Sequence, residues 1–227
     1  IDDEARPAVE LIFGGALSAD LVTFDLETGD ATDLYRYPDP KAYVRLPGWA
    51  IEDGPVQIQA FAPDQVAEAI RSGRVVTGHN IMGFDLPALV RAGAVTMTEV
   101  HQMAKDGRLF DSLLAARHLD PPMARDKGVD AIRKYDLDTL GRRFELGAKT
   151  AKASDLAKQY GGYDQIPTED PTYREYLTGD VELSRKLGAP LDASRAVRAA
   201  HFVADREDQL LFNGEPRFGL EGLLNAT

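Results

Sequence analysis

Cysteine is absent from this chain of 227 residues, which excludes disulfide bridges and thiolate metal sites. No run of about 18 apolar residues occurs, so the sequence predicts no membrane-spanning helix and no membrane partner. The N-terminus, Ile1-Asp2-Asp3-Glu4, is acidic where a secretory signal needs positive charge, and its lack of an initiator Met suggests a processed or excised piece. These absences together favour a cytoplasmic protein.

Positive charge is also in short supply. Lys and Arg number 26 against 37 Asp and Glu, which gives a formal net charge of −11. This balance argues against a general nucleic-acid coat, because such proteins depend on a basic surface for affinity. It leaves room for an enzyme that acts on nucleic acid through bound divalent cations, since these ions return positive charge where a phosphate lies.

The remaining composition is that of a globular protein. Hydrophobic residues make up 44% and charged residues 28%, enough apolar material for one α/β domain of ordinary size with an appendage. The Gly-rich phosphate loop and the Gly-x-Ser-x-Gly elbow do not occur. The four histidines have no metal-ligand spacing and are expected to be structural or exposed: His79, His101, His118 and His201.

Apolar patterning predicts the order of the elements. Strands are predicted at 20–26, 34–37, 43–51 and 75–78. Residues 56–61 are predicted to extend the hairpin that ends with the strand at 43–51. Helices are predicted at 62–72, 84–92, 111–119, 136–146 and 170–187. The stretch 147–162 has few apolar side chains and is interpreted as an extended connection. Strands first, then strand–helix alternation, indicate an α/β layered domain with a mixed sheet.

The pattern changes near residue 190. Residues 1–190 hold the predicted α/β domain, and residues 191–227 form a C-terminal appendage. Within the appendage, 194–211 has the spacing of one amphipathic helix, whereas 212–227 is predicted to be irregular.

Three short acidic clusters carry the candidate chemistry. In the first, Phe24-Asp25-Leu26-Glu27-Thr28, the two carboxylates lie two residues apart on a predicted strand, so both project from one face. Two carboxylates this close repel each other unless a cation lies between them, and Mg²⁺ or Mn²⁺ suits such oxygen ligands. The alternative is a solvated strand end, which the apolar run before Asp25 makes less favourable.

The second cluster runs from Gly78 to Asp85 and includes Asn80 and Phe84. Asp85 lies at a predicted helix start, where a carboxylate commonly caps the helix, and capping is the preferred interpretation of this residue taken alone. An amide and an aromatic ring beside a carboxylate can, however, hold a sugar and stack a base.

The third cluster is Tyr176-Leu177-Thr178-Gly179-Asp180. Its phenol and carboxylate lie four residues apart, on one face of a predicted helix. In this arrangement Tyr176 can hold a water that a metal on Asp180 polarises. The alternative is a Tyr packed on the core beside an exposed Asp, which is the better interpretation of an isolated pair.

Taken together, the clusters resemble the exonuclease motifs of the DEDD superfamily, 3′→5′ exonucleases with a ribonuclease H-like fold. The first cluster resembles motif one, Asn80-x-x-x-Phe84-Asp85 motif two, and Tyr176-x-x-x-Asp180 the tyrosine form of motif three. The likeness spans about residues 20–188 and is greatest to the proofreading domain of family A DNA polymerases of the bacteriophage and DNA polymerase I types. The stretches 109–117 and 135–140 support it, whereas Ala31 departs from the bulky apolar wedge usual there.

This resemblance implies a ribonuclease H-like three-layer domain, with a mixed central β-sheet flanked by helices, that removes nucleoside 5′-monophosphates from DNA 3′ ends. It implies two divalent ions, Mg²⁺ or Mn²⁺, about 4 Å apart. The implied catalytic and metal-binding residues are Asp25, which bridges the ions, Glu27 and Asp180 at the first ion, Asp85 at the second, and Tyr176, which orients the attacking water. The implied substrate-binding residues are Thr28, Asn80 and Phe84.

The implied partners are a single-stranded DNA 3′ end and a polymerase domain or subunit, for which residues 191–227 would be the linker or the beginning. The implied location is the cytoplasm of a bacterial cell or of a phage-infected bacterium. Two alternatives stay open. One is a ribonuclease D-like enzyme that processes RNA 3′ ends, and the other is a catalytically silent nucleic-acid-binding domain of the same fold.

Overall fold

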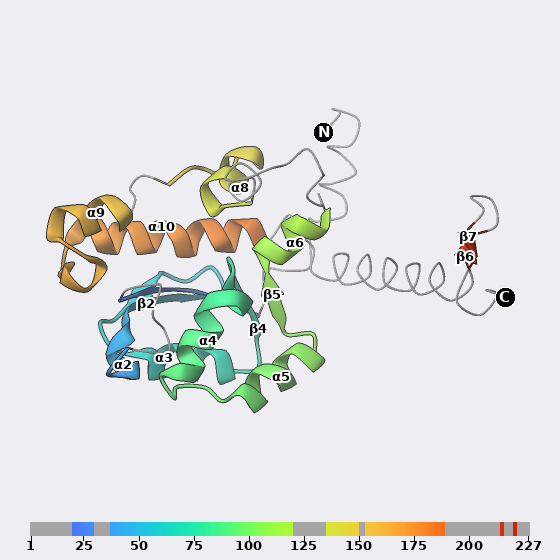
Figure 1. Ribbon diagram of the computed structural model, residues 1–227, viewed down its shortest axis with the longest axis horizontal. Coiled ribbons are helices and arrows are strands. Elements are labelled where there is room, and N and C mark those ends of the chain that lie inside the picture. The colour runs from blue at the N-terminus through green and yellow to red at the C-terminus, as the bar shows by residue number, and fades with distance from the viewer. Residues whose placement is uncertain are drawn as a thin grey trace. The chain divides into compact units, whose positions relative to one another are not determined.

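The computed structural model describes residues 20–29, 37–119, 135–149 and 153–188, together with 214–215 and 220–221. The chain divides into two compact units, residues 1–191 and residues 192–227. In the second unit the described structure is one antiparallel pair of short strands, β6 (Gly214–Glu215) and β7 (Leu220–Glu221), so the prediction of irregular structure is wrong at these four residues (Figure 1). The helix predicted at 194–211 lies outside the described residues.

A five-stranded sheet forms the centre of the first unit, in the order β3-β2-β1-β4-β5. The middle strand, β1 (Leu21–Thr28), pairs antiparallel with β2 (Val44–Ile51) and parallel with β4 (Val75–Gly78). At the edges, β3 (Gln57–Ile58) is antiparallel to β2, and β5 (Leu109–Asp111) is parallel to β4. The sheet is therefore mixed, and its assignment to the ribonuclease H-like type stays a prediction.

Helices cover both faces of this sheet (Figure 1). On one face lie α3 (Pro63–Arg71) and α4 (Leu86–Arg91), which bury their apolar sides against β1 and β2. On the other lies α10 (Pro171–Gly188), with α8 (Leu137–Arg143) and α9 (Ala153–Tyr160) packed beside it. Because side chains alternate along a strand, β1 sends its apolar residues to one face and its acidic residues to the face under α10.

The buried side chains form separate groups on the two faces. The group under α3 and α4 includes Val22, Phe24, Leu26, Val66, Ile70 and Leu89. The groups under α10 include Leu46, Ala50, Tyr173, Leu177 and Val181 towards α9, and Leu137, Leu140, Leu183 and Leu187 towards α8. The helix α10 is thus fixed along its whole length, which sets the positions of the polar residues that lie between its apolar ones.

Several elements differ from the sequence prediction. The stretch 147–162 contains the helix α9, because Leu156 and Ala157 alone suffice to bury one side of it. Residues 109–111 form the short strand β5, so the helix α6 (Ser112–Leu119) begins later than predicted. One turn of helix, α2 (Pro40–Tyr43), precedes β2. Of the strand predicted at 34–37, all but Tyr37 lies outside the described residues.

The helix α5 (Met97–Lys105) was not predicted, although the sequence carries a signal for it. Thr96 and Glu99 form a capping box, in which the Thr96 hydroxyl accepts from the Glu99 amide and the Glu99 carboxylate accepts from the Thr96 amide. The Thr-x-x-Glu spacing is the sequence signature of this arrangement. The prediction missed it because the helix buries little apolar surface, with Met103 as its fully buried residue.

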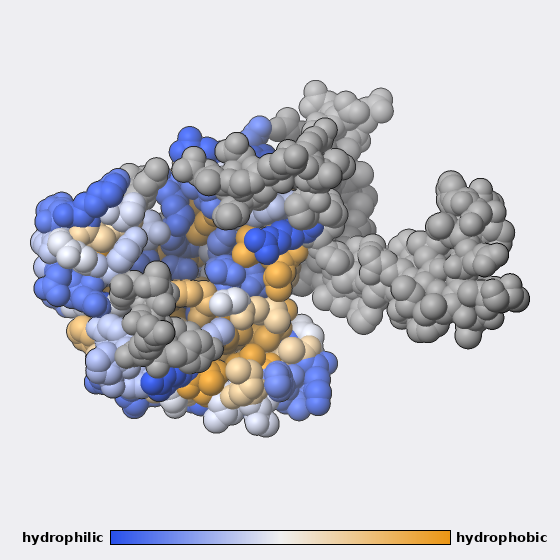
Figure 2. Space-filling view, in the orientation of Figure 1, coloured by the Kyte–Doolittle hydropathy of each residue, from blue (hydrophilic) through white to orange (hydrophobic). Residues whose placement is uncertain are grey.

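The surface of the first unit is of mixed character. In the view of Figure 2 apolar residues gather over α4 and β5, whereas α5 and α9 are mainly hydrophilic. The exposed large apolar side chains of the described part are Phe61, Met82, Met97 and Leu114. None of the described helices combines the length and apolar character that crossing a membrane requires.

Candidate metal centre

The strand β1 presents Asp25 and Glu27 from the face that α10 covers. Asp25 pairs in register with Gly48 of β2, and this glycine admits the helix. A Cβ atom at Gly48 would lie 2.8 Å from Cγ of Leu177, closer than van der Waals contact allows. The absence of a side chain at this position therefore lets α10 approach the sheet directly over the two acids.

The helix α10 supplies Tyr176 and Asp180, one turn apart on the side that faces β1. Asp180 is buried, with 4% of its surface exposed. Carboxylate oxygens of Asp25, Glu27 and Asp180 all lie within 4.8 Å of one another, although Asp180 is more than 150 residues away along the chain. Three oxygen ligands at this separation can hold one divalent ion of the Mg²⁺ or Mn²⁺ type.

The carboxylate of Asp85, the residue just before α4, also lies at this site. Asp85 ends η1, a π-helical turn over Ile81–Asp85, and it is buried with 2% exposed. Its Oδ1 atom accepts a hydrogen bond of 3.0 Å from the Leu26 amide, between the two acids of β1. Its side chain makes no capping hydrogen bond to α4, so the capping interpretation is wrong. Asp85 is instead tied to the middle strand.

All eight residues singled out from the sequence line one cleft of about 370 Å³. Its lining includes Asp25, Glu27, Thr28, Asn80, Phe84, Asp85, Tyr176 and Asp180. Thr28 is buried, and its hydroxyl donates a hydrogen bond to the Gly29 carbonyl. Thr28 therefore lines the cleft without offering it a free polar group. The roles assigned to these side chains stay predictions, but the fold does bring them together.

A further carboxylate, Asp111, supports the turn beside the cleft, a role that was not predicted from the sequence. Asp111 is buried at the end of β5, and it accepts hydrogen bonds from the amides of Asn80 (3.0 Å), Met82 (2.9 Å) and Leu113 (2.9 Å). These bonds fix Asn80 in a left-handed conformation, with φ of 61°. Asp111 therefore shapes the turn that carries Asn80 and Phe84.

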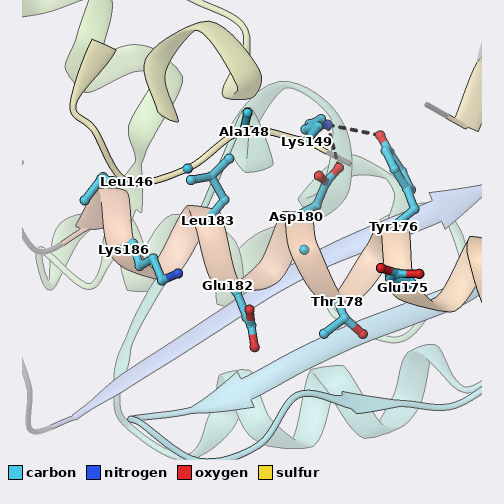
Figure 3. Close-up of a pocket in the computed structure, with 12 residues that line it drawn as sticks. Leu146, Ala148, Lys149, Glu175, Tyr176, Thr178, Asp180, Glu182, Leu183 and Lys186 are labelled. Atoms are coloured by element: carbon cyan, nitrogen blue, oxygen red, sulfur yellow. Dashed lines mark hydrogen bonds and ion pairs between the residues drawn. The ribbon is translucent and has the colours of Figure 1, made fainter. Parts of the chain in front are cut away.

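The most important residue that the sequence did not indicate is Lys149. Its Nζ atom lies 2.6 Å from Oδ2 of Asp180 and 3.0 Å from the hydroxyl of Tyr176 (Figure 3). No local signal marks it, because it lies in a stretch with little periodicity, 31 residues before Asp180. Lys149, Tyr176 and Asp180 also line an adjoining groove of about 260 Å³ along α10, which Figure 3 shows.

Burial and mutual repulsion govern the protonation of the acidic residues. Burial raises the pKa of Asp25 to about 8, and the charge of Asp180 adds to the rise while Lys149 opposes it. Burial raises the pKa of Glu27 and of Asp85 well above their usual range, and Asp25 adds to both. The pKa of Asp180 is also raised by burial, although Lys149 counteracts this.

The cleft has a deficit of positive charge. Burial lowers the pKa of His79 to about 4, so its imidazole is neutral near pH 7. Among the described residues that line the cleft, the single ammonium of Lys149 then faces five carboxylates, those of Asp25, Glu27, Asp85, Asp136 and Asp180. Such a set must take up protons or cations, since like charges at this distance cannot all remain ionised in a buried site.

Comparison with known proteins connects the chain to shell proteins. Residues 176–227 match a family described as encapsulating protein for peroxidase. The chain is 43% identical over 57 residues to the type 1 encapsulin shell protein EncA of Myxococcus xanthus, a match that covers 24% of this chain and 20% of that protein. It is 44% identical over 172 residues to the diheme-cytochrome-encapsulin shell fusion protein of Kuenenia stuttgartiensis, covering 74% of this chain and 44% of the relative. The chain spans less than half the length of each.

These matches contradict the identification of the chain as a DEDD-superfamily exonuclease. Tyr176 and Asp180, interpreted as the third exonuclease motif, lie within the segment that matches the shell family. The 3′→5′ exonuclease activity, the proofreading role in a DNA polymerase and the two nuclease-fold alternatives are contradicted with it. So are the predicted partners, a DNA 3′ end and a polymerase.

The error has a physical origin. Carboxylates two apart on a strand and a phenol one turn from a carboxylate on a helix bind cations in many settings, so the pattern indicates a kind of site and not a reaction.

Proposed function

We propose that this chain forms part of an encapsulin-type shell, and that its α/β unit, in which helix α10 carries the beginning of the matched segment, binds a divalent cation. The similarity of residues 176–227 to the encapsulating family is the observation that carries the proposal. The name of the Kuenenia relative describes a fusion of a diheme cytochrome with a shell protein, and the 74% of this chain that matches it is more than the second unit alone. Location in the bacterial cytoplasm belongs to the same proposal.

The described structure of the matched segment supports an assembling role. In its last part β6 pairs with β7 over two residues in each strand. An isolated pair of such short strands is at best marginally stable in water, because it buries too little apolar surface to offset the loss of chain entropy. We infer that subunit contacts in a shell supply a surface for this pair to pack against.

The cation-binding part of the proposal rests on the acidic cluster. Asp25, Glu27 and Asp180 offer three oxygens, and the Oδ1 atom of Asp180 is buried without a hydrogen-bond partner. An unpaired buried carboxylate oxygen is costly, and a bound cation would satisfy it. Mg²⁺ and Mn²⁺ fit the all-oxygen donor set, and water in the open cleft would complete their coordination. A second ion, held by Asp85 partly through water, is the finer part of this proposal.

The shell role is tested by co-expression of the full chain with EncA of Myxococcus xanthus. The chain should elute with shell-sized particles in size-exclusion chromatography, and Leu220→Lys, which places a charge in β7, should reduce its share. Asp25→Asn serves as the matched control, because it lies outside the matched segment and should enter the particles as the unchanged chain does. Elution of the unchanged chain apart from the particles would contradict the shell role.

The cation site is tested separately by isothermal titration calorimetry with Mn²⁺. The unchanged chain should release heat of binding, and Asp25→Asn should weaken the affinity by about tenfold or more, since each charged ligand contributes strongly to a hard cation. Asp64→Asn removes an equal charge from an exposed pair with Lys41 and should leave the affinity unaltered. Equal Mn²⁺ affinity in all three proteins would show that the cluster is not the binding site.

A further inference from the structure

We propose that Lys149 is a built-in cation of the acidic cleft, and that a divalent ion binds by displacing its ammonium from Asp180. The inference rests on the proposed cation site and adds the group that competes for it. Lys149 would thereby set the concentration of divalent ion at which the site fills.

The contacts of Lys149 show its ammonium bound by the same polar groups that would bind a metal ion. Its Nζ atom bonds to Oδ2 of Asp180 at 2.6 Å and to the Tyr176 hydroxyl at 3.0 Å, and it lies 4.9 Å from the centre of the Tyr176 ring (Figure 3). The aromatic face adds an attraction of its own for the positive charge. One side chain thus contacts both polar residues that α10 contributes to the cleft.

The backbone at and before Lys149 positions its side chain in the cleft. The amide of Lys149 donates a 2.8 Å hydrogen bond to Oδ1 of Asp138 on α8. Gly147 has φ of 129°, a conformation that other residues rarely adopt. Its carbonyl oxygen approaches α8 so closely that a Cβ atom at Gly141 would lie 2.7 Å from it. Two glycines and a carboxylate therefore fix the path by which this loop enters the cleft.

The ammonium and a divalent ion compete for Asp180. Lys149 occupies Oδ2, while the unpartnered Oδ1 belongs to the same carboxylate whose oxygens lie within 4.8 Å of those of Asp25 and Glu27. An ion held by this cluster would share Asp180 with an ammonium a few ångströms away, and their repulsion is substantial in a partly buried site. With 22% of its side chain exposed and a flexible stem, Lys149 can swing outward to solvent.

An ordinary buried ion pair would behave differently from such a competitor. If Lys149 only stabilised the fold, its removal would lower stability with or without a divalent ion and would not tighten ion binding. If it competes, its removal destabilises the ion-free protein, which loses its counter-charge, but strengthens ion binding. The two effects have opposite signs, which separates the interpretations.

The test uses the full chain and three variants. Lys149→Met removes the charge and keeps a side chain of similar length, whereas Lys149→Arg keeps a cation. Lys158→Met removes a lysine from an exposed pair with Asp155 on α9 and serves as the control for net charge. The readouts are the Mn²⁺ affinity by calorimetry and the melting temperature, followed by Trp49 fluorescence, in EDTA and in Mn²⁺.

We expect Lys149→Met to bind Mn²⁺ about tenfold more tightly than the unchanged chain, because the repulsion is gone. It should melt lower in EDTA and gain more on addition of Mn²⁺, while the Arg variant and the control stay close to the unchanged chain. Binding by Lys149→Met alone would also support the inference. Unaltered or weaker binding in Lys149→Met beside normal binding in the unchanged chain would overturn the inference and leave the proposed site intact. If neither protein binds, the proposed site fails, and the inference with it.

Discussion

Removal of a single charge from the acidic cluster should stabilise the protein when no divalent ion is present. Asp25 is the residue of choice, because it lies on the middle strand and burial raises its pKa from 3.8 to about 8. A carboxyl whose pKa is higher in the folded state binds its proton more tightly when folded. Its contribution to the free energy of unfolding therefore falls as the pH rises from about 4 towards about 8.

The size of the effect follows from this difference in pKa. At about 1.4 kcal/mol per unit, a carboxyl with a pKa of about 8 when folded and 3.8 when unfolded disfavours the folded state at pH 8 by about 5 kcal/mol. The cleft is open to water, and Lys149 lies close to Asp180, so hydration and counter-charge reduce this figure. We expect Asp25→Asn to raise the free energy of unfolding at pH 8 by about 2 kcal/mol, and by little at pH 4.

The assay is urea denaturation in EDTA at pH 4 and at pH 8, followed by the fluorescence of Trp49. This residue is the single tryptophan of the chain, and it is buried in β2, so its signal reports the α/β unit alone. Asp64→Asn is the control, since its exposed pair with Lys41 contributes less than about 1 kcal/mol. Lower stability of Asp25→Asn than of the unchanged chain at pH 8 in EDTA would refute the reasoning, because the ionised carboxylate would then be stabilising.

Three further outcomes follow from the same geometry. Mn²⁺ affinity measured by calorimetry should rise as the pH increases from 6 to about 8 and then level off, since protons on Asp25 compete with the ion; a flat profile would contradict the raised pKa. Gly48→Ala should destabilise the unit by about 1–3 kcal/mol in urea, because the new Cβ would press on Leu177; no change would mean that α10 is not held against β2. Arg45→Met should lower the unfolding free energy by about 2 kcal/mol, because the carbonyls of Tyr163 and Ile166 lose their buried donor; an unaltered urea midpoint would show that water replaces it.

The acidic residues of β1 and α10 could be placed from the sequence because their arrangement is local. The alternation of a strand puts Asp25 and Glu27 on one face, and the helical repeat puts Tyr176 and Asp180 one turn apart. Both relations depend on backbone geometry within a few residues. The prediction that these side chains meet in one cleft needed a family resemblance, and the resemblance supplied an activity that the matches to shell proteins contradict.

The partners of these acids were decided by tertiary structure. The capping interpretation of Asp85 was reasonable for a carboxylate at a helix start, but the Leu26 amide, 59 residues away in sequence, takes the hydrogen bond instead. The helix α9 formed where few apolar residues predicted a connection, because α10 offered it a surface on which to bury Leu156. In both cases a contact distant in sequence outweighed the local preference.

The sequence by itself determined which acidic residues gather on one face of a strand and of a helix, and the absence of thiol ligands. Tertiary structure alone decided that Lys149 enters the cleft and neutralises part of its negative charge. The reason is physical: the position of Lys149 depends on the path of a loop that Gly141, Gly147 and Asp138 fix against α8. The periodic pattern of apolar residues cannot predict such a path, because the path results from packing between elements that meet only in the folded chain.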